Sequence, residues 1–157
     1  MNDNILRKEL LGTLNGGNAH VTFEQAVNNV NPELRNKRPA DDIHSVWELL
    51  EHLRISQEDI LRYMVDPGWK SPKWPDEYWP DKKSTIVNDE MWNESIKKFS
   101  SDLEEIISIV NDNKTDLTSV IPHTENHTYL REILLVVNHN SYHIGQIAET
   151  RKLLGNW

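Results

Sequence analysis

The sequence predicts an all-α protein, a four-helix bundle with a long crossover loop between its second and third core helices. Apolar residues recur at three- and four-residue steps over several long segments, which is the spacing of a helix packed on one side. No segment alternates apolar and polar residues for long enough to predict a β-strand. At 157 residues, the chain can bury a sizeable core as one domain. We therefore expect a single helical domain over residues 1–157.

The first core helix is expected over Asn2–Leu14, where leucine and isoleucine residues are spaced for packing on one side. The Asn-Gly-Gly-Asn run at residues 15–18 is a strong turn signal that ends this helix. Thr22 followed by Gln25 resembles a capping box, in which each residue satisfies a backbone N–H of the other. A second, shorter helical segment is therefore expected to run to about Val30.

Three long helices follow. Ser45 and Glu48 form a capping box that begins the second core helix, and the Asp-Pro-Gly run at residues 66–68 ends it. The third core helix is expected over residues 89–111, whose apolar residues recur alternately every four and every three positions. The last is expected over residues 128–154, with a glycine directly after it as a stop signal.

The segment between the second and third core helices, residues 66–85, is rich in proline and aromatic residues. Proline prevents a regular helix, and an extended segment gains ~3.3 Å per residue against ~1.5 Å in a helix, so it could cross the full length of a neighbouring helix. The two helices that it joins would then run parallel. Its aromatic side chains either cover the bundle as a packed surface loop or form the wall of a pocket. These residues are Pro67, Trp69, Pro72, Trp74, Pro75, Tyr78, Trp79 and Pro80.

Composition excludes several classes of function. The formal net charge of −8, without clustered lysine and arginine, argues against a nucleic-acid partner. No apolar run approaches the ~20 residues that a membrane helix needs, and the N-terminal residues do not resemble a signal peptide. The chain has no cysteine, which is compatible with the cytoplasm that we expect as its location. Any metal ion must therefore be bound by nitrogen and oxygen atoms.

His139 and His143 lie four residues apart in the last predicted helix. This spacing places both imidazoles on one face, about 5–6 Å apart at Cβ, which is close enough to share an ion. Two histidines with ordinary hydrogen bonds would show the same spacing. A zinc-protease helix is excluded, because that motif requires glutamate directly after the first histidine and this chain has Asn140.

His52 lies on the flank of the apolar face of the second core helix. A single histidine at the edge of a core is most often a hydrogen-bonded core residue. In helical bundles, however, metal sites are built from inward-facing side chains of separate helices. Three neutral histidines from two helices would leave a coordination position open, as catalytic rather than structural sites do. His52, His139 and His143 are thus the candidate ligands of one divalent transition metal ion.

The other histidines have simpler interpretations. His123 and His127 repeat the four-residue spacing, but they follow Pro122 and precede the helix. We expect His127 to be a surface loop residue, whereas the loop that carries His123 could fold over the metal site. His20 and His44 are interpreted as a loop residue and a residue at the entry to a helix.

Several segments of the chain together resemble the DinB/YfiT-like superfamily of helical-bundle metalloproteins. The resemblance extends from about residue 5 to the end of the chain, and the order and separation of its motifs carry it. The matching segments are Ser45–Leu53, Ile121-Pro122-His123, Leu130–Leu134, His139-x-x-x-His143-x-Gly145-Gln146 and Arg151–Gly155.

This resemblance implies a four-helix bundle with a long crossover, and often a homodimer. It implies that His52, His139 and His143 are the metal ligands. Gly145 would allow close approach of a helix, and Gln146 would either support a ligand histidine or pack as an amide between helices. Imidazole binds several metals; zinc or nickel are the first candidates for the ion, with iron or manganese as alternatives.

Characterised members of the superfamily include thiol-dependent S-transferases, so the resemblance implies a metal-dependent enzyme acting on a small-molecule substrate. Since the chain lacks cysteine, a low-molecular-weight thiol would have to be a cosubstrate. No carboxylate base is predicted, because Glu48, Glu51 and Glu132 are expected to cap or solvate their helices. The alternatives are a metal-dependent hydrolase, a non-catalytic metal-binding or stress-response protein, and a bundle without metal.

Overall fold

A computed structural model describes residues 3–81 and 86–157 of the chain. Within these residues it contains five α-helices and no β-strand, which confirms the predicted all-α fold. An isolated β-bridge joins Val120 to Thr128 in the turn before the last helix. Asn2 of the first predicted helix and residues 82–85 of the predicted crossover lie outside the described residues.

The long helices begin and end close to the predicted residues. Ser45 accepts a hydrogen bond from the Glu48 N–H while Glu48 accepts one from the Ser45 N–H, so the predicted capping box is confirmed. Gly155, with φ of 70°, follows the last helix as expected. The helices are α1 (Asp3–Leu14), α2 (Phe23–Val27), α3 (Val46–Val65), α4 (Asp89–Asn111) and α5 (Tyr129–Leu153), with 3₁₀ turns η1 (Pro32–Leu34) and η2 (Asp76–Tyr78).

The predicted length of α2 was wrong. The capping box of Thr22 and Gln25 is present, but the helix ends at Val27 and not near Val30. Asn28 is extended, and Asn29 has φ of 55° in the left-handed region. Asparagine tolerates this conformation because its short polar side chain bonds locally, and a right-handed helix cannot continue through it. Two successive asparagines were therefore the stop signal.

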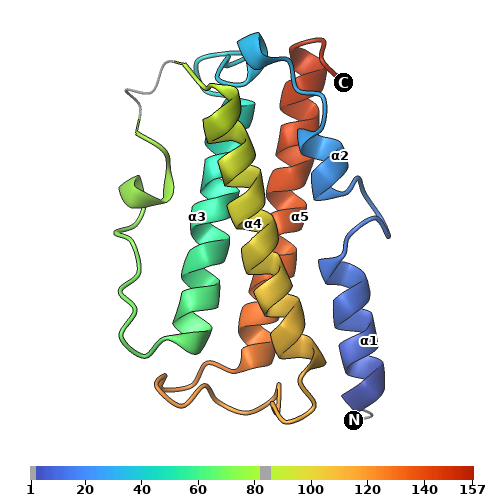
Figure 1. Cartoon of the computed structure of the whole chain (residues 1–157), viewed down its shortest axis with the longest axis vertical. Coiled ribbons are helices and arrows are strands. Elements are labelled where there is room, and N and C mark those ends of the chain that lie inside the picture. The colour runs from blue at the N-terminus through green and yellow to red at the C-terminus, as the bar shows by residue number, and fades with distance from the viewer. Residues whose placement is uncertain (1–2, 82–85) are drawn as a thin grey trace.

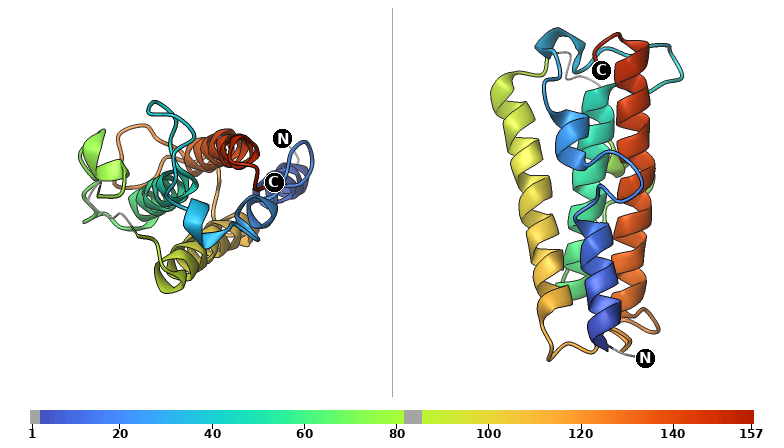
Figure 2. Two further views of the ribbon diagram at one scale, coloured as in Figure 1. Left: turned by 90° about the horizontal axis from the view of Figure 1, so that it is seen from above. Right: turned by 90° about the vertical axis from the view of Figure 1, so that its right-hand side faces the viewer.

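The helices form an up-down-down-up bundle (Figure 1). α1 and α5 run upwards in this view, whereas α3 and α4 both run downwards and are joined by the crossover segment at the left. The predicted crossover between parallel helices is thus confirmed. α3 packs against both α4 and α5, and the space between α4 and α5 is closed by α1 in the lower half and α2 in the upper half (Figure 2).

The core consists of an upper and a lower cluster of apolar side chains. Trp47, Leu50 and Phe99 belong to the upper cluster and Leu61, Ile106 and Ile133 to the lower one. Burial of each such side chain stabilises the fold by roughly 1.5–3 kcal/mol. Among the helices of residues 3–81 and 86–157, none combines the length and apolar character that crossing a membrane requires.

A chain of buried amides sets the register of α5 on α3. Asn140 donates from Nδ2 to Gln57 Oε1 at 2.8 Å, and Gln57 donates from Nε2 to the Phe99 carbonyl of α4 at 2.7 Å. Sliding either helix by one turn would leave these buried amide groups without partners, at a cost of about 1–3 kcal/mol for each group. Because Asn140 follows His139 directly, this register also decides which residues of α3 face the histidines of α5.

Candidate metal centre

His52 of α3 and the pair His139 and His143 of α5 meet between the two helices. The Nε2 atoms of His52 and His139 are 3.2 Å apart. The ring centroids of the three histidines are separated by 4.4 to 5.0 Å. One nitrogen from each ring lies within 4.8 Å of the other two. The predicted convergence of imidazoles from distant parts of the chain is therefore present in the fold.

Hydrogen bonds from the outer ring nitrogens fix the tautomers of two histidines. His52 donates from Nδ1 to the carbonyl oxygen of Tyr78 at 2.9 Å, and His143 donates from Nδ1 to Gln146 Oε1 at 2.6 Å. Both carbonyl oxygens can only accept, so each Nδ1 carries the proton and each Nε2 keeps its lone pair. Of the two roles open for Gln146, support of a histidine is therefore the one seen, and its Nε2 also donates to Tyr142.

The three rings fit a small divalent cation. Two nitrogens bound at 2.0–2.1 Å to a tetrahedral ion lie about 3.3 Å from each other, close to the 3.2 Å between Nε2 of His52 and Nε2 of His139. Among the residues that the structure describes, none forms a hydrogen bond with the buried Nδ1 of His139. The Nε2 lone pair of His52 can accept a proton that His139 Nε2 donates, or it can bind a cation that lies between the two nitrogens. The cluster contains no carboxylate, so an ion would keep its full positive charge.

Burial keeps these histidines neutral. It lowers the pKa of His52, and burial together with the two neighbouring rings lowers the pKa of His139 to about 3. Burial, followed by the charge that His52 would carry, lowers the pKa of His143 to about 4. A neutral imidazole is the form that binds a metal. All three rings are therefore ready to act as ligands near neutral pH, without first losing a proton.

The crossover segment covers the His52 ring with the side chain of Trp79. The Trp79 indole stacks on the His52 ring with 4.1 Å between centroids and 6° between planes, and it also stacks on the His44 ring with 4.1 Å between centroids. Trp79 also lines a cavity of about 660 Å³ together with His44, so the expectation that crossover aromatics wall a pocket holds for this residue. Trp74, by contrast, is 74% exposed. His44 is a helix-entry residue as expected, and it also belongs to this stack.

A second cavity is also lined by His44. Its volume is about 250 Å³, and its lining includes Leu49, one turn before His52, and Gln146, which contacts His143. The two cavities share Asp42 and His44 in their walls. Among the described residues, none of the three clustered histidines lines either cavity, but Trp79 and Gln146, which do, contact His52 and His143.

Two expectations about the surroundings of the site were wrong. Gly145 lies on the exposed face of α5, and a Cβ atom built there would have no neighbour within 4 Å among residues 3–81 and 86–157, so no helix of this part of the chain approaches it closely. His123 does not fold over the site. Its Nε2 bonds the carbonyl of Tyr63 at 2.8 Å, and Tyr63 lies eleven residues after His52 in α3, about 16 Å along the helix axis.

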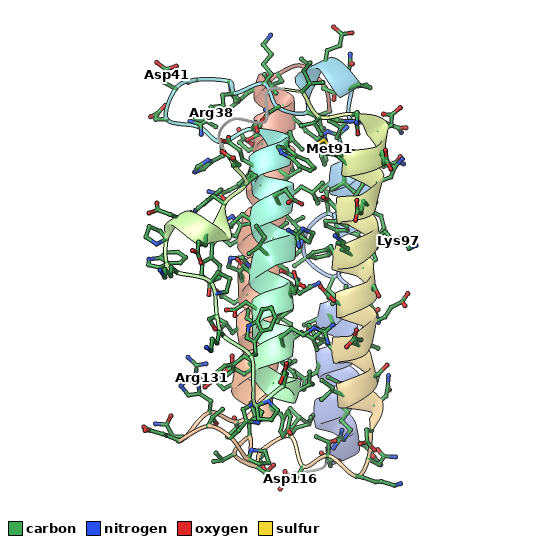
Figure 3. The ribbon with its side chains drawn as sticks, turned by 60° about the vertical axis from the view of Figure 1, so that its left-hand side comes forward. Arg38, Asp41, Met91, Lys97, Asp116 and Arg131 are labelled. Carbon is green, nitrogen blue, oxygen red and sulfur yellow. The ribbon has the colours of Figure 1, made fainter. Side chains whose placement is uncertain are left out.

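The three glutamates differ in their roles. Glu48 caps α3 and also accepts from Arg38, and Glu51 is paired with Arg54. Glu132 departs from the expectation of a solvated residue, because it is only 2% exposed and is paired with Arg131 and His127. Figure 3 shows Arg131 near the lower end of the bundle, well below Arg38 at the upper end.

Asp59 and Tyr78 were missed as functional candidates in the sequence. The Tyr78 carbonyl holds His52, and its hydroxyl donates to Asp59 Oδ2 at 2.6 Å. Burial, together with this bond, raises the pKa of Tyr78 to about 12, so the hydroxyl remains a donor. Asp59 lies seven residues after His52, two turns along the same helical face, and that spacing was the available signal.

An up-down-down-up bundle in which two helices and a crossover enclose three histidines defines a class of helical proteins able to hold a divalent ion. Residues 18–147 match the DinB superfamily, and the chain belongs to this superfamily. The matched range includes all three histidines of the cluster. No curated protein and no solved structure matches the chain. Superfamily membership and the histidine cluster together fit a metal-binding DinB-like protein.

Proposed function

We propose that this protein is a metal-dependent enzyme in which His52, His139 and His143 bind one divalent transition metal ion. One observation carries the proposal: the Nε2 lone pair of His52 faces Nε2 of His139 on another helix at 3.2 Å, while the opposite nitrogens of His52 and His143 are held by Tyr78 and Gln146. Histidine ligands of metals commonly have this arrangement, in which the second ring N–H donates to a carbonyl.

Zinc and nickel are the proposed ions, with iron and manganese as alternatives. Three imidazoles favour the metals that bind borderline nitrogen ligands over magnesium or calcium, which prefer oxygen. Three protein ligands leave one or more positions for a small molecule. The two cavities lined by Trp79 and by Gln146 have the space that such a molecule needs. These two side chains contact His52 and His143, so a small molecule in either cavity would lie one side chain away from the cluster.

Elemental analysis of protein purified without a histidine tag tests this proposal. We expect close to one equivalent of bound ion per chain in the wild type and a loss of binding in His52→Ala. His20→Ala is the matched control, because His20 lies in the loop before α2, bonds Ser141 of α5 and is outside the cluster. Tag-free protein that remains metal-free after incubation with zinc, nickel, iron and manganese would contradict the proposal.

The reaction that we propose is the transfer of a low-molecular-weight thiol to an electrophile. An ion bound by the three histidines would lower the pKa of a thiol that enters the open position. The sulfur then forms a bond to the electrophilic carbon, the leaving group departs with its electron pair, and the thiol proton passes to solvent. The chain has no cysteine, so the sulfur comes from the cosubstrate. The uncharged ligand set favours this chemistry because it does not neutralise the ion.

A turnover assay tests this step. Metal-loaded protein is mixed with bacillithiol, glutathione or cysteine and with an aryl halide, and the released halide is measured. We expect turnover that requires the ion, the thiol and His139. Metal binding without turnover for any thiol would favour a non-catalytic protein, and ester or amide cleavage without a thiol would favour a hydrolase. A cytoplasmic location, a homodimer and the lack of a nucleic-acid partner stay predictions.

A further inference from the structure

A single carboxylate attaches the crossover to the helix that carries His52. Asp59 Oδ1 accepts a hydrogen bond from Trp69 Nε1 at 2.7 Å, and Oδ2 accepts one from the Tyr78 hydroxyl at 2.6 Å. Trp69 lies near the beginning of the crossover and Tyr78 lies in η2, near the end of its described part. Asp59 therefore binds the crossover at two points that are nine residues apart in the sequence.

Tyr78 connects this attachment to the histidine cluster. Its side chain bonds Asp59, and its carbonyl oxygen accepts from His52 Nδ1 at 2.9 Å. The next residue, Trp79, lies flat on the His52 ring. The tautomer and the ring plane of His52 are thus both set by residues of the crossover. The other outer contact of the cluster, between His143 and Gln146, stays within α5.

Displacement of Tyr78 would affect His52 in two ways. Loss of the carbonyl contact would let the ring proton move between Nδ1 and Nε2, and the Nε2–H tautomer cannot bind a cation through that atom. Loss of the Trp79 contact would let the ring rotate away from His139. Neither effect needs any change in the fold of α3, because His52 and Asp59 stay on a helix that is capped independently by Ser45.

We infer that Asp59 is a positioning residue for the metal centre, which holds the crossover so that Tyr78 and Trp79 fix the tautomer and orientation of His52. This inference extends the proposed function, since it assigns control of metal affinity to a residue that is not a ligand. In histidine metal sites, loss of the group that orients a ligand lowers metal affinity by roughly 10–100-fold. Asp59 orients the carbonyl acceptor and not the ring itself, so the loss of metal affinity should lie at the lower end of this range of roughly 10–100-fold.

Graded substitutions at the attachment test the inference. Asp59→Ala removes both carboxylate acceptors, whereas Asp59→Asn keeps one oxygen acceptor. Tyr78→Phe removes the hydroxyl donor, and Trp69→Phe removes the indole N–H donor. In metal-free protein, ¹H–¹⁵N correlation spectra of the histidine rings should show one Nδ1–H tautomer for His52 in the wild type. We expect a mixture of tautomers in Asp59→Ala and in Tyr78→Phe, and a smaller change in Trp69→Phe.

Titration with Ni²⁺ or Zn²⁺ provides the second measurement. We expect affinity to fall about tenfold in Tyr78→Phe and by at least as much in Asp59→Ala. Tyr63→Phe is the matched control. It also removes one tyrosine hydroxyl, but this hydroxyl bonds His127 and is not part of the attachment at Asp59. Its metal affinity should stay within about twofold of the wild type.

The outcomes separate the inference from the proposed function. If the variants lose thermal stability but keep the wild-type His52 tautomer and metal affinity, Asp59 only stabilises the loop and the inference is overturned. If the wild type binds no metal, the proposed function fails, whereas the tautomer spectra still decide whether Asp59 controls His52. If Asp59→Ala does not fold, Tyr78→Phe decides the question with the loss of a single oxygen atom.

Discussion

Two pairs of histidines share the same four-residue spacing and have different environments. His139 and His143 lie on one face of α5, opposite His52, with 4.4 Å between their ring centroids. His123 and His127 lie in the turn below the bundle, where Tyr63 accepts from one ring through its carbonyl and contacts the other through its hydroxyl. The pair in α5 (the upper pair) faces a third imidazole, whereas both rings of the pair in the turn (the lower pair) bond Tyr63.

The difference shows what a histidine spacing can predict. Four residues bring two rings together only when the intervening backbone is helical, and Pro122 and the turn before Thr128 exclude that for the lower pair. A metal site further requires a third ligand from another element and burial that keeps the rings neutral. The upper pair meets these conditions, and the following predictions test whether the contrast has the expected consequences.

The largest expected effect is stabilisation by metal. An ion that binds only the folded state at a thousand times its Kd raises the free energy of unfolding by about 4 kcal/mol. For a chain of this size, that corresponds to an increase in melting temperature of about 8–16 °C. In thermal denaturation with zinc, we expect this increase in the wild type and in His127→Ala, but not in His143→Ala. Equal increases in all three proteins would remove the distinction between the pairs.

The second effect is a loss of stability of the metal-free protein in acid. The pKa values of His139 and His143 are about 3 and 4 in the fold and near 6.5 in an unfolded chain. Below pH 6.5 the unfolded state therefore binds more protons, and stability falls as pH falls towards the folded pKa values. With allowance for partial solvent access, the loss should reach about 2 kcal/mol at pH 5.

Urea denaturation at pH 7 and pH 5 measures this loss. The double variant His139→Asn/His143→Asn removes both titrating rings and should show a smaller dependence on pH. An unchanged dependence would mean that the two rings are not kept neutral by burial.

A third and smaller effect concerns Gln146, which holds His143 within α5. Gln146→Ala removes the acceptor of the His143 Nδ1–H group, and we expect metal affinity to fall about tenfold. Glu149→Ala is the control, since Glu149 is exposed one turn farther along the same helix. Isothermal titration with Zn²⁺ measures both variants, and a similar affinity for the two would show that Gln146 does not orient the ligand.

The smallest effect belongs to the lower pair. Tyr63→Phe removes the hydroxyl that bonds His127 at 2.9 Å, and a lost hydrogen bond of this kind costs about 1 kcal/mol of stability. Metal content should not change, because neither Tyr63 nor His127 belongs to the cluster of His52, His139 and His143. Chemical denaturation measures the stability, and a concurrent loss of metal would indicate that the two ends of the bundle are coupled.

Much of the fold could be predicted because its signals are local. The capping box of Ser45 and Glu48, the alternating apolar steps of residues 89–111 and the prolines of the crossover each act within a few residues. The end of α2 was missed because the left-handed Asn29 has no periodic signature. The parallel α3 and α4 followed from the reach of the crossover, which depends on length and not on tertiary contacts.

The site could be predicted only in part. His139 and His143 are close in sequence, and His52 was found through its place beside an apolar face. The contacts from Tyr78 and Trp79 could not be derived, because they depend on where an irregular segment settles on α3. The burial of Glu132 was missed for a similar reason: its partner His127 comes from the turn before α5, and Tyr63, which bonds His127, comes from another helix.

The amide chain from Asn140 through Gln57 to Phe99 has a consequence for how the protein is made. His52 and His139 are separated by 87 residues, and α5 is the last helix of this sequence to leave the ribosome. Three nitrogens can therefore surround an ion only after α5 has docked and the amides have set its position. Metal uptake would follow the docking of α5 as a late event, and a bound ion would mark chains in which this part of the fold is complete.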